Sequence, residues 1–168
     1  MKTLFLIAFA LITTANAAYA PAQRSVRLFH IEKSTNKNIV CYDANLNADG
    51  TINEKTPVSA YWLMNEEDGR RESLSWIERK KAFGYSFEKT PDGEFLLTPN
   101  ADEDWKLTVL LKDGEPVAEL PISGKASIVK RVFLQVEQGM ILPTVKSVEL
   151  YGKCPVTGSA TYEKKIID

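Results

Sequence analysis

The sequence predicts a mostly β fold: an antiparallel meander curled into a barrel or half-barrel with one short α-helix. A two-sheet β-sandwich is the alternative. Short segments rich in β-branched and aromatic residues alternate between apolar and polar positions, and Gly, Pro, Asn and Asp turn signals separate them at regular intervals. The chain has 168 residues without an internal repeat, which suits one domain.

Residues 1–17 are predicted to be a signal peptide. Lys2 supplies the positive start, residues 4–12 form an apolar run too short to span a bilayer, and Ala15-Asn16-Ala17 fits a cleavage site of small residues. A second such site at 18–20 is the less favoured alternative. We therefore expect one mature domain over 18–168, without a membrane anchor, exported to the periplasm or the extracellular space.

The charge balance bears on partners. Without Lys2 the mature chain carries 20 basic and 22 acidic residues. A dedicated nucleic-acid-binding domain normally shows a basic excess on one face, so we expect no nucleic-acid partner.

Cysteine and histidine usage limits covalent and metal chemistry. Cys41 and Cys154 are a disulfide candidate in an oxidising compartment, and two free thiols are the open alternative. With His30 as the single histidine, too few zinc ligands remain, and we expect no metal or cofactor. Residues 45–53 resemble the start of a calcium loop, but Thr56 stands where the twelfth-position acid belongs, so a turn at Asp49-Gly50 is favoured.

The first strands are predicted at 26–33 and 39–44, joined by a polar turn, with a third, strongly apolar strand at 58–64. Alternation in the first strand places Phe29 and Ile31 on one face and Leu28 and His30 on the other.

A short helix is predicted from Trp76 to Phe83. Ser75 and Glu78 fit a capping box, and Gly84 stands at the position of a C-terminal cap. Two turns are marginal alone in water, so Trp76, Ile77 and Phe83 are expected to dock onto the sheet. Arg79 would then lie on the free face.

The β pattern continues to the C-terminus. Asp113-Gly114 predicts a tight hairpin, and in 126–137 the even positions 126, 128, 132, 134 and 136 are predicted to face the core. The remaining strands are predicted at 85–88, 94–98, 105–112, 115–121, 126–137, 145–151 and 160–166.

Several short motifs suggest a family. These are the run from Leu28 to Ser34, Asn36-Lys37-Asn38, Tyr42-Asp43-Ala44 with Asp49-Gly50, Pro57-Val58 with Tyr61-Trp62, and Trp76 to Lys80 running into Ala82-Phe83-Gly84. Together they resemble the exported bacterial proteins of the domain of unknown function 4833. The resemblance implies an exported single domain and carries no activity, substrate or catalytic residues.

No motif specifies a reaction. His30 stands in a strand, and the chain has no G-x-S-x-G elbow for a serine nucleophile. One hypothesis is a carboxylate-dependent hydrolase acting on envelope or extracellular carbohydrate, for which Glu32, Asp43, Glu66 and Glu78 are candidate acids.

The favoured hypothesis is a non-enzymatic module that binds a partner or a small apolar or amphipathic molecule. A cupped sheet offers such a ligand a mouth, and aromatic side chains with one cation would line it. The candidate residues are Tyr42, Tyr61, Trp62, Trp76, Arg79 and Tyr85.

Overall fold

The computed structural model describes residues 24–138 and 143–167 and confirms a mostly β fold curled into a half-barrel with one short helix. The predicted signal peptide lies outside the described residues. The elements, in order, are β1 (Arg24–Lys33), β2 (Asn36–Leu46), β3 (Val58–Leu63), β4 (Arg71–Ser73), α1 (Trp76–Glu78), η1 (Arg79–Phe83), β5 (Tyr85–Lys89), β6 (Phe95–Pro99), β7 (Leu107–Lys112), β8 (Glu115–Ile122), β9 (Lys125–Glu137), β10 (Thr144–Lys153) and β11 (Ala160–Ile166).

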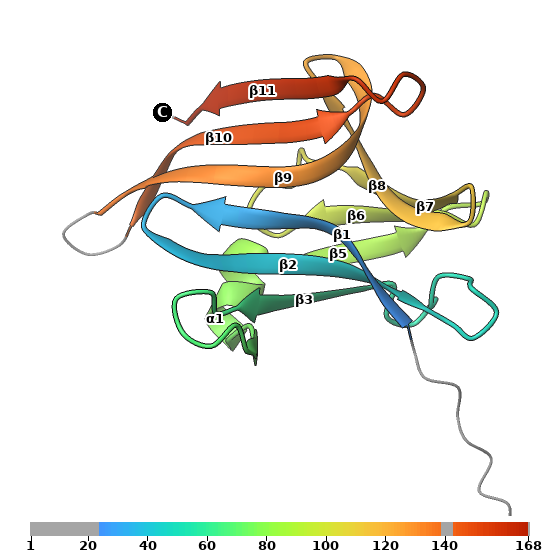
Figure 1. Ribbon diagram of the computed structural model, residues 1–168, viewed down its shortest axis with the longest axis horizontal. Coiled ribbons are helices and arrows are strands. Elements are labelled where there is room, and N and C mark those ends of the chain that lie inside the picture. The colour runs from blue at the N-terminus through green and yellow to red at the C-terminus, as the bar shows by residue number, and fades with distance from the viewer. Residues whose placement is uncertain (1–23, 139–142, 168) are drawn as a thin grey trace, which may run out of the picture.

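Strand β9 joins the two halves of the sheet. Its residues 125–128 pair with β8, residues 131–134 pair with β1 along the same edge, and β10 followed by β11 extends from its other edge. Two meanders therefore diverge from β9, one running β1-β2-β3-β4 and the other β8-β7-β6-β5. Figure 1 shows the first below β9 and the second behind it.

The pairing of β1 with β9 is parallel, in contrast to the antiparallel pairing predicted throughout. It runs from His30 opposite Arg131 to Lys33 opposite Leu134. Parallel neighbours need a long connection, and here all the strands from β2 to β8 provide it. This contact holds the two meanders together, so the sheet curls instead of separating into a sandwich.

Two β-bulges change which side chains face the core. The register of β1 against β2 skips Leu28, so Leu28 and Phe29 are both buried, although alternation places them on opposite faces. The register of β9 against β10 skips Lys130, so Val129 enters the core where alternation predicts Ile128. An extra residue on one strand shifts the alternation by one position.

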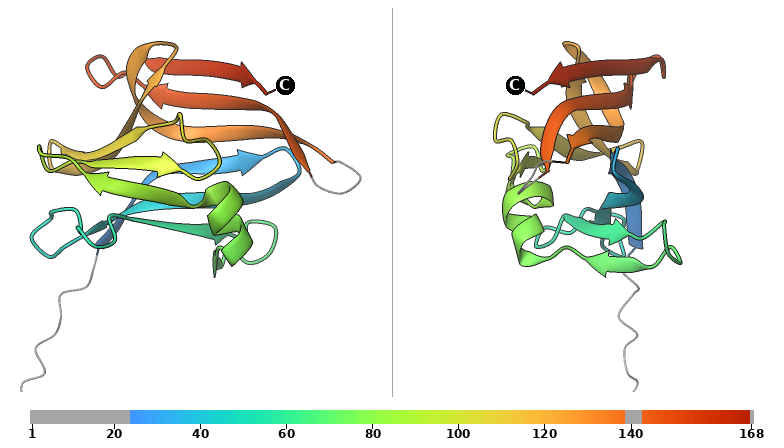
Figure 2. Two further views of the ribbon diagram at one scale, coloured as in Figure 1. Left: turned by 180° about the vertical axis from the view of Figure 1, so that it is seen from behind. Right: turned by 90° about the vertical axis from the view of Figure 1, so that its left-hand side faces the viewer.

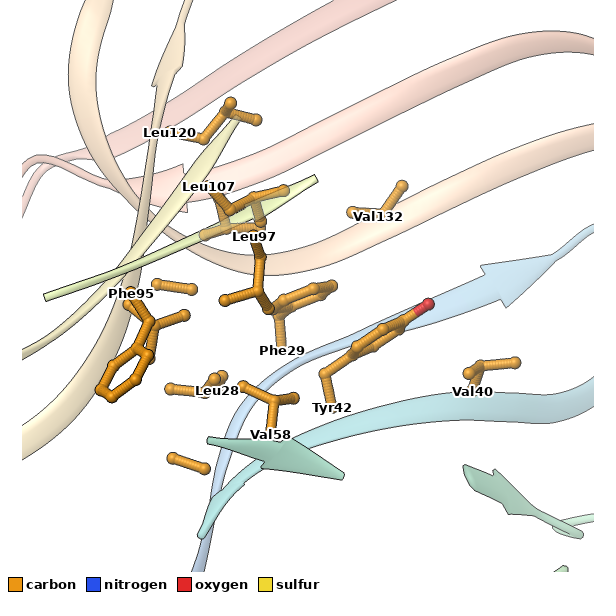
Figure 3. Packing of buried hydrophobic residues seen from close by; sticks show 14 of the residues in the cluster. Leu28, Phe29, Val40, Tyr42, Val58, Phe95, Leu97, Leu107, Leu120 and Val132 are labelled. Atoms are coloured by element: carbon orange, nitrogen blue, oxygen red, sulfur yellow. The ribbon is translucent and has the colours of Figure 1, made fainter. Parts of the chain in front are cut away.

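The core fills the space between the meanders. Phe29 and Tyr42 stack with their ring centroids 4.5 Å apart, and Leu97 from β6 lies close to them from the facing meander (Figure 3). In the view of Figure 3, Leu120 and Val132 both lie above the Phe29 and Tyr42 rings. The buried side chains thus come from both meanders and from β9.

Local turn chemistry matches the sequence. Asp113 and Gly114 have φ of 52° and 81° and connect β7 to β8, as a two-residue hairpin of mirror-image turn type requires. Ser123 and Gly124, at 50° and 72°, connect β8 to β9 in the same way. Gly50 has φ of 85° and ends a turn that begins at Asn47, where its N–H donates to the Asn47 carbonyl at 3.0 Å.

The helix occupies residues 76–83 as predicted, with one π-helical stretch after its first turn. Ser75 and Glu78 form the predicted capping box. Gly84 differs from the prediction because its φ is −77°, so it is not a left-handed cap. A Cβ there would lie 1.8 Å from the Arg79 carbonyl oxygen, so glycine is required by this close approach.

The predicted docking of the helix through Trp76 and Ile77 is wrong. Their side chains are 71% and 65% exposed, whereas Phe83 packs against the core and Leu74, just before the helix, is buried. Figure 2 shows the helix on the opposite side of the interior from β1 and β2. Its last residues are the ones that reach the core, because the chain there turns into β5.

The two cysteines are free, so the disulfide prediction is wrong. Cys41 is buried in the middle of β2, and Cys154 follows the end of β10, beyond disulfide distance.

No helix in the described ranges is long and apolar enough to span a bilayer.

Candidate functional site

An apolar cavity of about 290 Å³ opens between the two meanders. The wall takes residues from β1 and β2, from the end of the helix, from each strand from β5 to β10, from the segment between β6 and β7, and from the residue after β11. The lining residues are Phe29, Ile31, Tyr42, Ala82, Phe83, Tyr85, Leu97, Pro99, Ala101, Asp102, Trp105, Leu107, Leu120, Val129, Val132, Leu134, Val145, Val148 and Ile167.

Two tyrosines supply phenol groups to this wall, and both donate their hydroxyl hydrogens to the backbone. Tyr42 donates to the carbonyl of Phe83 at 2.7 Å, and Tyr85 donates to the carbonyl of Val58. Burial raises the pKa of Tyr42, and it raises the pKa of Tyr85 to about 12. Both phenols are therefore neutral, and neither has a donor left for a ligand.

The remaining wall is almost entirely hydrocarbon. Asp102 is the one residue with a formal charge among the described lining residues, and Trp105 follows it three positions later in the chain. A buried ion or an unpaired hydrogen-bonding group would lose its hydration in such a cavity without compensation. The cavity thus suits an apolar molecule or the apolar part of an amphipathic one.

The six predicted site residues do not form one site. Tyr42 and Tyr85 line the cavity, as the favoured hypothesis expects. Tyr61 points to the opposite face of the sheet, where its hydroxyl donates to buried Asp43 at 2.6 Å and accepts from Arg27 at 3.0 Å. Arg71 lies over the Tyr61 ring at 4.5 Å, so this tyrosine belongs to a charged network.

Trp62 lies between the cavity and the surface. It is 8% exposed, its ring meets Phe83 edge to face at 5.3 Å, and its indole N–H donates to Glu78 at 3.0 Å. Trp62 also lines a second hollow, of about 350 Å³, together with Lys33. The Lys33 ammonium lies 4.3 Å from the centroid of the Trp62 ring. Trp62 therefore supports the cavity wall through Phe83 without lining the cavity.

Trp76 and Arg79 lie away from the cavity. Trp76 is exposed, with the Lys80 ammonium 5.0 Å from its ring centroid. The Arg79 guanidinium donates to the carbonyl of Leu74 at 3.1 Å.

Sequence reasoning missed most of the lining, because it selected candidates by aromatic type. Phe83 and Trp105 are aromatic lining residues that it did not select, and Leu97, Leu120 and Leu134 are aliphatic. The available signal was alternation, which placed Phe29 with Ile31 on one face and Val132 with Leu134 on another.

The four candidate acids make structural contacts. Glu32 accepts from Arg131 at 2.9 Å and bonds to His30 at 3.0 Å, and Asp43 pairs with Arg27 and Tyr61. Glu66 accepts from the backbone of Lys37 at 3.0 Å, while Glu78 caps the helix.

None of these acids lines the apolar cavity. Burial alone raises the pKa of Glu32 and of Glu78, but hydrogen bonds to each carboxylate outweigh it and leave both pKa values below their usual range. A general acid needs a raised pKa, so neither group is suited to that role. Within the described ranges, no three His, Cys, Asp or Glu side chains converge to hold a metal ion.

Comparison with known proteins identifies the family. Residues 29–164 match the family described as Domain of unknown function (DUF4833). The chain belongs to the DUF4833 family. No curated protein and no solved structure matches it.

The DUF4833 match covers both meanders and the helix. It includes every cavity-lining residue except Ile167, which lies just after its end. The cavity is therefore built almost entirely from the DUF4833 domain.

Proposed function

We propose that this DUF4833 protein binds a small apolar molecule, or the apolar part of an amphipathic one, in the cavity between its meanders. The supporting observation is a hydrocarbon wall in which both tyrosine hydroxyls already donate to backbone carbonyls. Concave, mostly apolar sites with few polar groups are typical of small-molecule binding.

The size of the cavity limits the ligand. About 290 Å³ is at the lower end of the range of ligand pockets, so one short chain or one small ring system fits better than a large lipid. Burying about eight methylene groups contributes roughly 6 kcal/mol, and the loss of ligand freedom on binding subtracts from it. We expect dissociation constants in the micromolar to millimolar range.

Fluorescence of the neutral probe N-phenyl-1-naphthylamine tests the proposal. Wild-type protein should enhance the probe's emission saturably, because the cavity removes the probe from water. Leu134→Trp should weaken the affinity for the probe at least tenfold, because the larger side chain fills the cavity. Val156→Trp is the matched control, because Val156 is 89% exposed and does not line the cavity.

Overpacking at Leu134 costs stability, typically about 1–3 kcal/mol, so circular dichroism melts must show that the variant is folded at the assay temperature. A folded Leu134→Trp protein that binds the probe as tightly as wild type would contradict binding in this cavity. The same holds if wild type gives no saturable signal.

Export is the second part of the proposal. Its support is the order of charge, apolar run and small residues in 1–17. Protein from the extracytoplasmic fraction should begin at Ala18 by N-terminal sequencing. Full-length protein retained in the cytosol would contradict it.

A further inference from the structure

We propose that the ligand is a single-chain amphiphile with a positively charged end group, which Asp102 and the Trp105 ring bind at the rim of the cavity. This inference rests on the proposed function, because the chain of the ligand would occupy the apolar cavity. The end group must stay at the rim, since both tyrosine hydroxyls of the interior already donate to backbone carbonyls and Asp102 is the one charged residue in the described part of the lining.

Asp102 provides the attraction for a cation. It is the charged residue of the cavity lining, and its side chain is exposed at the rim. One carboxylate oxygen accepts from the backbone N–H of Asp104 at 3.0 Å, which fixes the side chain and leaves the other oxygen without a protein partner among the described residues. A ligand ammonium supplies N–H donors that suit this oxygen.

Trp105 provides the second contact. Its ring lines the cavity, and its backbone N–H donates to the Asp102 carbonyl at 3.3 Å, so the two residues are held together. Aromatic faces attract cations through the ring quadrupole. The structure shows this attraction in use, because the Lys165 ammonium lies 5.3 Å from the Trp105 ring centroid.

Lys165 itself decides how the proposal is tested. It stands two residues before the lining residue Ile167, and its ion pair with Glu163 is long, at 3.8 Å. A cationic end group would compete with this ammonium for the Trp105 ring. An anionic end group would instead be attracted by Lys165 and repelled by Asp102, so the two kinds of ligand predict opposite effects of the two residues.

The experiment displaces N-phenyl-1-naphthylamine with three probes of equal chain length: octylamine, octanol and octanoate, at pH 7 and low salt. The amine is protonated at this pH, as lysine is. Octylamine should bind about fivefold more tightly than octanol, which corresponds to one exposed ion pair together with one cation–π contact, and octanoate should bind most weakly.

Two variants should act in opposite directions. Asp102→Asn should reduce the preference for octylamine over octanol at least twofold, because only the contact with the Trp105 ring remains. Lys165→Gln should increase this preference two- to threefold, and octanol affinity should stay unchanged in both variants. Lys164→Gln is the matched control, because Lys164 pairs with Glu149 at 3.3 Å and points to the other face of β11. It should leave all three affinities unchanged.

The outcomes separate the two proposals. Equal affinity for the three probes, or tightest binding of octanoate, would overturn the cationic end group and leave the apolar cavity standing. An unchanged amine preference in Asp102→Asn would also overturn it. If neither the naphthylamine nor octanol binds, the proposed function itself fails, and the inference fails with it.

Discussion

Replacing Trp62 and Trp76 separately by alanine is the sharpest test of how the helix is held. Trp62 is 8% exposed, packs edge to face against Phe83 and donates to Glu78, whereas Trp76 is 71% exposed. Removing a buried aromatic side chain costs about 3–5 kcal/mol, so Trp62→Ala should lose at least that much. It also removes one hydrogen bond from the Glu78 carboxylate.

Trp76→Ala should cost no more than about 1 kcal/mol, the value of an exposed cation–π contact, here with Lys80. Urea unfolding followed by circular dichroism measures both, with the slope m checked for constancy. In a domain of this size the melting temperature should fall by roughly 6–20 °C for Trp62→Ala and by less than about 4 °C for Trp76→Ala. A large loss for Trp76→Ala beside a small loss for Trp62→Ala would refute this account of the helix.

Three further predictions concern particular contacts. Gly84→Ala should destabilise the protein by about 3 kcal/mol in the same unfolding assay, because its Cβ would lie 1.8 Å from the Arg79 carbonyl oxygen. The control Gly93→Ala, at a position with open space and φ of 84°, should cost only about 1–2 kcal/mol. Equal costs for the two variants would contradict the steric argument. The pKa of Glu78 is lowered in the fold, so its contribution to stability is present above about pH 4.5 and is lost as the pH falls through the folded-state pKa. Glu78→Gln should therefore lower the free energy of unfolding at pH 7 and make it fall less steeply as the pH drops below about 4.5. If urea unfolding shows the same decrease in acid for the variant and the wild type, this linkage is contradicted. In native protein Cys154 should react fast with a disulfide reagent and Cys41 should not, since hydrogen bonds from Thr157 lower the pKa of Cys154 while burial raises the pKa of Cys41. Unfolding should make the Cys41 thiol reactive as well. Finding no free thiol would contradict the separation of the two cysteines.

The sequence by itself determined the elements and their order. Strand positions, the helix at 76–83 and its capping box follow from contacts between residues close in the chain. The turn at Asp113-Gly114 is local in the same sense, because the positive φ that it needs is a property of those two residues. One short strand, β4, was missed, since Arg71–Ser73 has no apolar alternation and pairs only at the sheet edge.

Only the tertiary structure decided which side chains meet. The bulges at Leu28 and Lys130 depend on the partner strand, so alternation within one strand could not reveal them. The parallel pairing of β1 with β9 joins segments about 100 residues apart, and no local pattern encodes it.

In the cavity, too, residue type indicated some of the lining, and the tertiary structure decided the rest. Tyr42 and Tyr85 were found from their residue type, but Tyr61, one position before Trp62, lies on the outer face, and Trp62 supports the wall from behind. Residue type says that a side chain is large and apolar. Its place is set by the curl of the sheet, because the two meanders enclose a space only after β9 has joined them at different points along its length.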